Sequence, residues 1–234
     1  MHIDVNSAFL SWQATYNLQH GETLDLREIP SAVGGNQLDR RGIVLAKSTP
    51  AKKFGIQTGE GIWQAKQKCP HLVVVPPNYE LYMMCSSALY ELISEYSPKI
   101  QRFSIDEMFI DFTGMERHFG ESFEAAHMIK DRVKKELGFT VNIGIGHNKL
   151  LAKVAGDLKK PDMVHTLLTK EEIEKKMWPL PVEDLFMVGR ASKKKLDLMN
   201  IKTIGDLANS DVKLLQGKLK SHGFLIWQYA NGID

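Results

Sequence analysis

Hydrophobic and polar positions along this chain of 234 residues follow two different periods. Short runs of apolar and β-branched residues predict strands at residues 3–6, 42–47, 72–75, 100–113 (two runs that meet at 106–107) and 140–146. Longer stretches with apolar residues at every third or fourth position predict helices at residues 7–20, 78–96 and 120–137. From residue 170 onward the strand patterns stop, and only short helices are expected.

The order of these elements predicts an α+β fold. Strand, helix, two strands, helix and strand give the β-α-β-β-α-β order of a ferredoxin-like sheet, which we expect to carry its helices on one face. Glycine and proline are dense between residues 20 and 76, which indicates an inserted small α+β subdomain. The segment that follows residue 170 is expected to form a separate all-α unit.

Composition narrows the class of protein only a little. A hydrophobic fraction of 43% and a charged fraction of 25% exclude a disordered or collagen-like chain, and the apolar runs are too short to span a membrane. The N-terminus carries no secretion pattern, so we expect a cytoplasmic protein. Cys69 and Cys85 form no C-x-x-C pair, which argues against a disulfide scaffold or a zinc ribbon. A net charge of +2 says little about a polyanionic partner.

Three carboxylates are the first candidates for chemistry. Asp106 and Glu107 stand where two strand-like runs meet, and the predicted topology places the first strand, with Asp4, beside them. Clustered carboxylates repel one another, and a divalent cation that prefers hard oxygen ligands, Mg²⁺ or Ca²⁺, relieves the repulsion. Solvated acids are also common in turns, so the turn pair alone leaves that alternative open. Asp111 has no comparable neighbour and is interpreted as structural.

Cationic segments supply the complement that phosphoryl or nucleotidyl transfer requires. They are residues 50–53, 147–153 and 159–160. Gly144 and Gly146 precede a helix start whose backbone N–H groups could bind an anion. Taken singly, each of these lysines is better interpreted as a solvated surface charge.

The C-terminal helical segment is locally basic. Residues 188–223 hold eight Lys and Arg against three Asp, a balance of +5. Arg190 lies beside a glycine turn between two predicted helices, a geometry that presents amides and cations to a phosphodiester backbone. A solvated helix face would have the same composition, and both interpretations stay open.

Six short motifs occur in one order along the chain. They are DVNSAF (4–9), AVGG (32–35), AKKFG (51–55), SIDE (104–107), GIGHNKLLAK (144–153) and KP (160–161). In content and order they are similar to the motifs of Y-family translesion DNA polymerases of the ImpB/MucB/SamB type. The resemblance implies a catalytic palm (1–17 and 77–167), fingers (18–76) and a helix-hairpin-helix thumb (168–234). It also implies a fourth, little finger domain that is absent here, so we expect a truncated catalytic core.

The resemblance assigns roles to individual residues. Asp4, Asp106 and Glu107 would be catalytic and would bind two Mg²⁺ ions together with the Val5 carbonyl. Phe9 falls at the steric gate that excludes a ribose 2′-hydroxyl. The positions for the incoming triphosphate are Ala8, Phe9, Thr49, Lys52 and Lys160. Those over the nascent base pair are Ile43 and Leu45, and those for DNA binding are Lys149, Lys153, Val188, Gly189, Arg190 and Lys193.

Four residues depart from the family pattern. Thr49 stands where many relatives have Tyr, Lys52 replaces a common Arg, and His147 replaces Ser or Pro. Met187 replaces the first glycine of the thumb hairpin. Losing the bidentate fork of Arg at position 52 would change how the nucleotide is held.

The function implied is a DNA-directed DNA polymerase that extends a primer opposite damaged template in DNA repair. The implied partners are primer–template DNA and a deoxynucleoside triphosphate, with a sliding clamp as a candidate partner of the absent C-terminal part, no membrane, and a monomeric state. One alternative is a non-catalytic DNA-binding or scaffold fragment, against which the intact carboxylate trio argues. A nucleotide cyclase with a similar palm is disfavoured by the helix-hairpin-helix segment.

Overall fold

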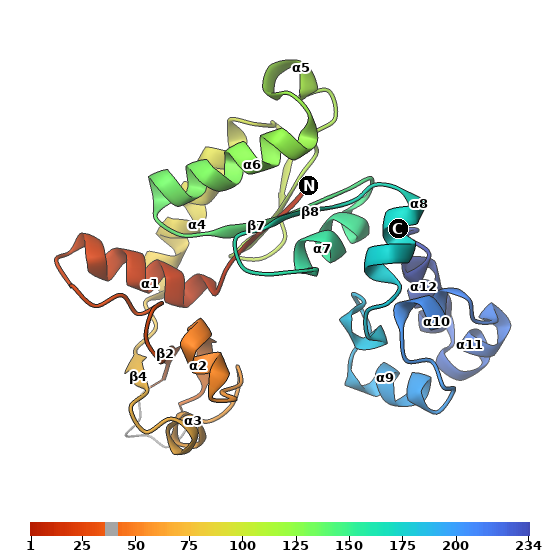
Figure 1. Cartoon of the computed structure of the whole chain (residues 1–234), viewed down its shortest axis with the longest axis horizontal. Coiled ribbons are helices and arrows are strands. Elements are labelled where there is room, and N and C mark those ends of the chain that lie inside the picture. Colours follow the sequence, from red (N-terminus) through yellow and green to blue (C-terminus); the bar gives the residue numbers. More distant parts are fainter. Residues whose placement is uncertain (36–41) are drawn as a thin grey trace.

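A five-stranded sheet forms the centre of the molecule in a computed structural model that describes residues 1–35 and 42–234 (Figure 1). Its strand order is β5-β6-β1-β7-β8, and a smaller sheet has the order β3-β2-β4. The strands of the central sheet are β1 (His2–Val5), β5 (Ile100–Arg102), β6 (Glu107–Ile110), β7 (Val141–Gly146) and β8 (Val164–Leu167). Those of the smaller sheet are β2 (Ser31–Gly34), β3 (Val44–Lys47) and β4 (Val73–Val75).

The helices divide among the two sheets and the C-terminal unit. The helices of the N-terminal part are α1 (Ala8–Gln19), α2 (Thr49–Lys53), α3 (Ile62–Lys68) and α4 (Tyr79–Ser94). Those of the central part are α5 (Glu116–Phe119), α6 (Ser122–Arg132), a π-helical turn (Val133–Leu137) and α7 (Lys149–Asp157). The rest are α8 (Lys170–Glu172), a π-helical turn (Ile173–Met177), a 3-10 turn (Val182–Asp184), α9 (Arg190–Asp197), α10 (Ile204–Ala208), α11 (Val212–Leu219) and α12 (Ser221–Ala230).

The central sheet has the predicted ferredoxin-like order. β1 lies between β6 and β7 and pairs antiparallel with both. A fifth strand, β8, extends the sheet by pairing parallel with β7, and the sequence did not predict it. Its four residues, Val-His-Thr-Leu, place two polar side chains in the middle, so the apolar run that would have indicated a strand is interrupted.

Helices cover both faces of the central sheet, so the prediction of helices on one face is wrong for α7. Ile3, Met108 and Ile143 point into the main apolar core, which also contains buried residues of α4 and α6. On the opposite face α7 lies directly against β7, where Gly144 and Gly146 leave room for its backbone. Glycine at these two positions therefore decides how closely α7 can approach the sheet.

Gly144→Ala is expected to destabilise the fold strongly. A Cβ at this position would lie 1.9 Å from the Ala152 carbonyl oxygen and 2.2 Å from the Gly156 nitrogen, and neither backbone can yield without moving α7. We expect the free energy of unfolding to fall by about 3 kcal/mol or more. Gly217→Ala is the matched control, because its added Cβ would meet nothing within 4 Å in the described structure. Equal denaturation midpoints for the two variants would contradict this account of α7 packing.

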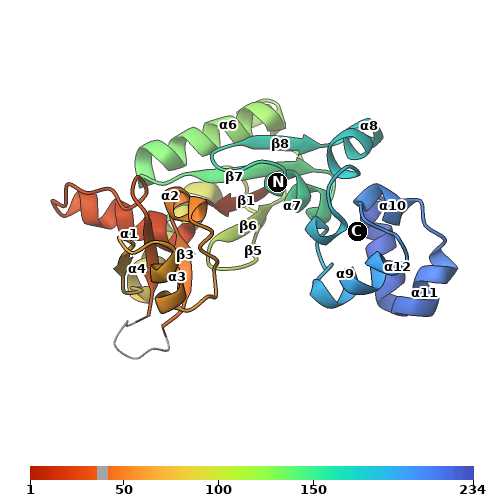
Figure 2. The same ribbon diagram turned by 60° about the horizontal axis from the view of Figure 1, so that its bottom comes forward.

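Three separate apolar clusters form the interior. The largest joins the central sheet to α1, α4 and α6. The second joins the smaller sheet to α2 and α3, with Val44, Ile56 and Ile62 among its buried residues. The third joins the C-terminal helices to α7, with Leu151, Leu196 and Leu215 among its buried residues. The smaller sheet and the C-terminal helices stand at opposite ends of the central sheet (Figure 2). Within residues 1–35 and 42–234, no helix is both long enough and apolar enough to cross a membrane.

Candidate active site

The register of β1 and β6 brings two of the predicted carboxylates together. Asp4 and Glu107 are direct cross-strand partners in this antiparallel pair. The Val5 N–H donates to the Asp106 carbonyl oxygen at 3.1 Å, so Asp106 lies at the next step along the same strands. The ends of these two strands therefore hold all three predicted acids close together, as the topology argument expected. We call this end of the central sheet, with Asp4, Asp106 and Glu107, the acidic edge.

Glu107 is held by two donors. His2 Nε2 lies 2.9 Å from Glu107 Oε2, and the Lys153 ammonium donates to the same oxygen. The bond from His2 is the largest cause that lowers the pKa of Glu107 to about 2, and Lys153 adds to it against the opposing effect of burial. Glu107 is therefore firmly ionised at neutral pH.

Asp4 is paired with a different lysine. Its carboxylate accepts from the Lys160 ammonium, which also reaches Asp157 Oδ1 at 2.8 Å. Burial nevertheless raises the pKa of Asp4 above its usual value, because it outweighs the attraction of Lys160, and the charges of Glu107 and Asp106 raise it further. Asp4 is therefore close enough to both other carboxylates to be affected by their charges.

Asp106 is bound by its own turn. The Ser104 hydroxyl donates to Asp106 Oδ1 at 2.6 Å, and the Asp106 N–H lies 3.3 Å from the Ser104 oxygen. The carboxylate lines a cavity described below, so one of its sides stays accessible.

The donor set of this edge fits a hard divalent cation in its chemistry. Carboxylate oxygens, together with a strand carbonyl, are the ligands that Mg²⁺ prefers. The ammonium groups of Lys153 and Lys160 already supply positive charge to Glu107 and Asp4. Across the described residues, no three His, Cys, Asp or Glu side chains stand close enough to form a metal cage by themselves. Asp4 and Glu107 are thus lysine-paired carboxylates, whereas Asp106 is held by the Ser104 hydroxyl.

A cavity of about 300 Å³ adjoins this edge and gathers six of the predicted residues. They come from β1, α1, β3, α2 and the β5–β6 turn, and they are Val5, Ala8, Phe9, Leu45, Lys52 and Asp106. These residues are separated by up to a hundred positions in the sequence, and the fold alone brings them around one space. The cavity therefore joins a carboxylate, an aromatic ring and a cation.

Lys47 is a second cation of this cavity, and the sequence reasoning missed it. It lies two residues after Leu45 on β3 and lines the cavity with it. Its Nζ donates to Thr58 Oγ1 at 3.1 Å, and burial together with the nearby Lys52 charge lowers its pKa. The signal that could have found it is the two-residue period of the strand, which places positions 45 and 47 on the same face.

Other aromatic rings pack against Phe9. It stacks on Tyr82, with ring centroids 4.5 Å apart and an angle of 9° between planes, and it meets Tyr79 edge-on at 6.0 Å. Trp12, fully buried on the same helix, lies 6.1 Å away. The ring is thus fixed at the cavity wall, although its place on α1 would equally suit a core residue.

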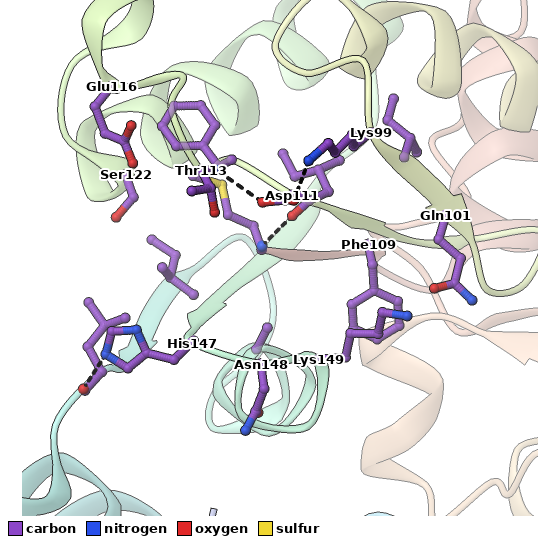
Figure 3. A pocket seen from close by; sticks show the side chains of 18 residues that line it. Lys99, Gln101, Phe109, Asp111, Thr113, Glu116, Ser122, His147, Asn148 and Lys149 are labelled. Atoms are coloured by element: carbon purple, nitrogen blue, oxygen red, sulfur yellow. Dashed lines mark hydrogen bonds and ion pairs between the residues drawn. The ribbon is translucent and has the colours of Figure 1, made fainter. Parts of the chain in front are cut away.

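Asp4, Glu107 and Lys160 stand at the acidic edge without lining this cavity. Ile43, Thr49 and Lys149 lie apart from both the cavity and the acidic edge. Ile43 is 45% exposed, Thr49 begins α2 and faces solvent, and Lys149 lines a different cavity of about 770 Å³ (Figure 3). That larger cavity lies between the start of α7 and the end of β6, with Phe109 and Asp111 on its wall. Asp111 pairs there with Lys99 at 3.4 Å and is far along its strand from the acidic edge, in keeping with a structural role.

The hairpin before α9 is only partly free. Gly189 and Arg190 are exposed, whereas the Val188 side chain is buried and its N–H donates to the Leu185 carbonyl at 3.0 Å. Lys193 is engaged with Asp197 at 2.8 Å and with Glu183 at 3.3 Å. Of the four hairpin residues predicted to bind DNA, Gly189 and Arg190 are thus the ones presented to solvent.

Comparison with known proteins gives three consistent findings. The model of the impB/mucB/samB family matches residues 3–157. The chain is 54% identical to a DNA polymerase IV of Clostridium acetobutylicum over 233 residues and 42% identical to a DNA polymerase IV of Acetivibrio thermocellus over 234 residues. Both alignments cover 100% of this chain but only 58% and 57% of the relatives, so the chain spans little more than half their length.

Solved structures share the fold. DinB from Sulfolobus solfataricus superposes with a TM-score of 0.84 over 99% of this chain and 66% of its own, at 23% identity. An insertion ternary complex of Dbh DNA polymerase gives the same TM-score and the same coverage. At this level of identity the likeness is one of fold.

Proposed function

The chain belongs to the impB/mucB/samB family, and from this membership we propose that it is the catalytic core of a translesion DNA-directed DNA polymerase. The observation that carries the proposal is the 300 Å³ cavity beside the acidic edge. It brings together Asp106, the Phe9 ring, Lys52 and the start of α1, which are separate in the sequence. A nucleotide with three phosphates requires such a combination of cations and amides next to carboxylates that bind metal.

Each side of the site has a task in the proposed reaction. Divalent ions, when bound by Asp4, Asp106, Glu107 and the Val5 carbonyl, would activate the primer 3′-hydroxyl and neutralise the triphosphate. Lys52 and Lys47 hold the phosphates from the side of the smaller sheet, and Lys160 leaves Asp4 to bind them from the other side. The first N–H groups of α1, at Ala8 and Phe9, point along the helix axis toward the same anion.

The substrates follow from this arrangement. We propose that they are primer–template DNA and a deoxynucleoside triphosphate. The insertion ternary complex of Dbh DNA polymerase, which has a similar fold, supports this pair of substrates. The central sheet would act as palm, the smaller sheet unit as fingers and the C-terminal helices as thumb. A sliding clamp and a monomeric state remain part of the proposal.

Primer extension tests the function directly. The chain, supplied with Mg²⁺, a primed template and all four deoxynucleoside triphosphates, is expected to lengthen the primer, and chelation of the metal should stop it. Binding of primed DNA without extension, by this chain and by a version as long as its relatives, would favour the non-catalytic scaffold instead.

Duplex binding by the thumb is expected to depend steeply on salt. Arg190, Lys194 and Lys195 are exposed at the start and middle of α9. If they neutralise about three phosphates, affinity for duplex DNA falls about 40-fold between about 50 and 200 mM salt. Arg190→Ala should lower the slope of log affinity against log salt by about 1. Lys170→Ala, at the distant start of α8, is the matched control, and an equal change of slope in both variants would argue against a hairpin contact with phosphate.

A further inference from the structure

His2 is a fully buried polar residue beside the acidic edge. It is 0% exposed and lies on β1, two residues before Asp4 and therefore on the same face of the sheet. Its ring packs against Phe109, its cross-strand partner, with centroids 4.7 Å apart. Burying an imidazole in this way is costly unless its nitrogens are used.

The one hydrogen bond of the ring in the described structure goes to Glu107. Nε2 lies 2.9 Å from Glu107 Oε2, whereas the buried Nδ1 finds no partner among the described residues. A carboxylate oxygen accepts, so this contact assigns the ring hydrogen to Nε2. The imidazole is therefore oriented toward a single oxygen atom of the carboxylate.

Lys153 reaches that same oxygen from the opposite side. Its ammonium, on α7, donates to Glu107 Oε2, and its side chain is only 16% exposed. Among the contacts of the described residues, none is made to Glu107 Oε1. Two donors thus hold one oxygen of the carboxylate and leave the other uncommitted.

We propose that His2 is a positioning residue that fixes the Glu107 carboxylate so that Oε1 is presented to a divalent cation. The inference rests on the proposed function, because it needs Glu107 to be a metal ligand. Partners of this kind orient the ligands of a metal, and their loss costs about 10- to 100-fold in metal affinity or activity. A histidine that merely filled the core would leave metal affinity unchanged when replaced by a side chain of similar volume.

A pair of nearly isosteric variants separates the two roles. His2→Gln keeps an N–H donor close to the position of Nε2, whereas His2→Met keeps the volume and removes the donor. His165→Met is the matched control. His165 lies on β8, pairs with Gly144 of β7 and makes no contact with Glu107. Mn²⁺ affinity is measured by electron paramagnetic resonance with primed DNA and a non-hydrolysable deoxynucleotide present, and kcat and KM for the nucleotide are measured separately.

We expect His2→Met to weaken Mn²⁺ binding about 10- to 100-fold and to lower kcat more than it raises KM. His2→Gln should stay within about threefold of the unmodified chain, as should His165→Met. Equally tight Mn²⁺ binding by His2→Met and the unmodified chain overturns the inference and leaves the proposed function intact. An unmodified chain that neither binds Mn²⁺ nor extends a primer overturns the proposed function and this inference with it.

A measurement on the unmodified chain covers the case in which His2→Met does not fold. Nitrogen-15 NMR of the histidine rings is expected to show the His2 hydrogen on Nε2, and addition of Mg²⁺ should shift this Nε2 resonance but leave that of His165 in place. The proposal is overturned if the hydrogen lies on Nδ1, or if the His2 Nε2 resonance does not shift when Mg²⁺ is added.

Discussion

Asp4→Asn and Glu107→Gln are both expected to abolish primer extension but to change stability in opposite directions. If both acids are metal ligands, as proposed, removing either one costs several kcal/mol of transition-state stabilisation, so the rate should fall by about 10³-fold or more. Burial raises the pKa of Asp4, so its ionised form opposes folding, and Asn should raise the free energy of unfolding. Glu107, whose pKa is lowered to about 2, stabilises the fold above pH 4.5, and this stabilisation disappears as the pH falls toward 2.

The stability difference has a direct measurement. Loss of the Glu107 charge leaves His2 and Lys153 with a weaker acceptor, so Glu107→Gln should lower the free energy of unfolding by about 1–3 kcal/mol at neutral pH. Denaturant unfolding in metal-free buffer measures it, and primer extension is measured on the same preparations. Asp111→Asn is the matched control, because this exposed acid contacts Lys99 at 3.4 Å and the Thr113 N–H at 3.1 Å, away from the acidic edge, and should change the rate little. A substantial rate retained by Asp4→Asn would contradict its assignment as a ligand.

The acidic edge could be predicted from the sequence because it depends on strand order. Once the ferredoxin-like order is recognised, β1 must lie beside β6, and Asp4 then stands opposite Glu107. The helix predicted at residues 78–96 is equally local, and Asn78 caps its start by accepting from the Leu81 N–H at 3.1 Å. Features set by neighbouring residues or by a short list of topologies are accessible from one sequence.

The partners of the carboxylates could not be predicted in this way. Lys160 is 156 residues from Asp4, and Lys153 is 46 residues from Glu107. Which lysine reaches which acid depends on how closely α7 approaches the sheet, and that distance is fixed by the backbones that meet at Gly144. Sequence reasoning assigned these lysines to phosphates and DNA, and it did not foresee that they first neutralise the acids.

The features that the sequence did not predict were missed for a different reason. β8 carries two polar residues in a run of four, and Lys47 resembles any surface lysine until β3 places it beside Leu45. The position of α7 on the second face was not predicted, although two glycines two positions apart on β7 are a sequence signal for a closely packed helix. In each case the residue type was ambiguous and the tertiary neighbour decided its role.

Phe9→Ala is expected to remove discrimination against ribonucleotides. The ring lines the cavity and is held by its stack on Tyr82, and in the proposed role of steric gate it would block a ribose 2′-hydroxyl. Truncation to Ala opens the space below the sugar, and the ratio of kcat/KM for deoxy- over ribonucleotides should fall by about 10- to 100-fold. Incorporation of single deoxy- and ribonucleoside triphosphates opposite a defined template base measures this ratio.

The size of the effect must be separated from a loss of packing. Phe9 also belongs to an aromatic cluster with Trp12, so Phe9→Ala should lower the free energy of unfolding by about 1–3 kcal/mol as well. Tyr16→Ala removes another ring from the same helix, 37% exposed and outside the cavity, and it should leave the sugar ratio unchanged. Because instability lowers the rates for both sugars together, only a gate changes their ratio. If the ratio stays the same in Phe9→Ala, Phe9 is a core residue and not a steric gate, and another residue selects the sugar.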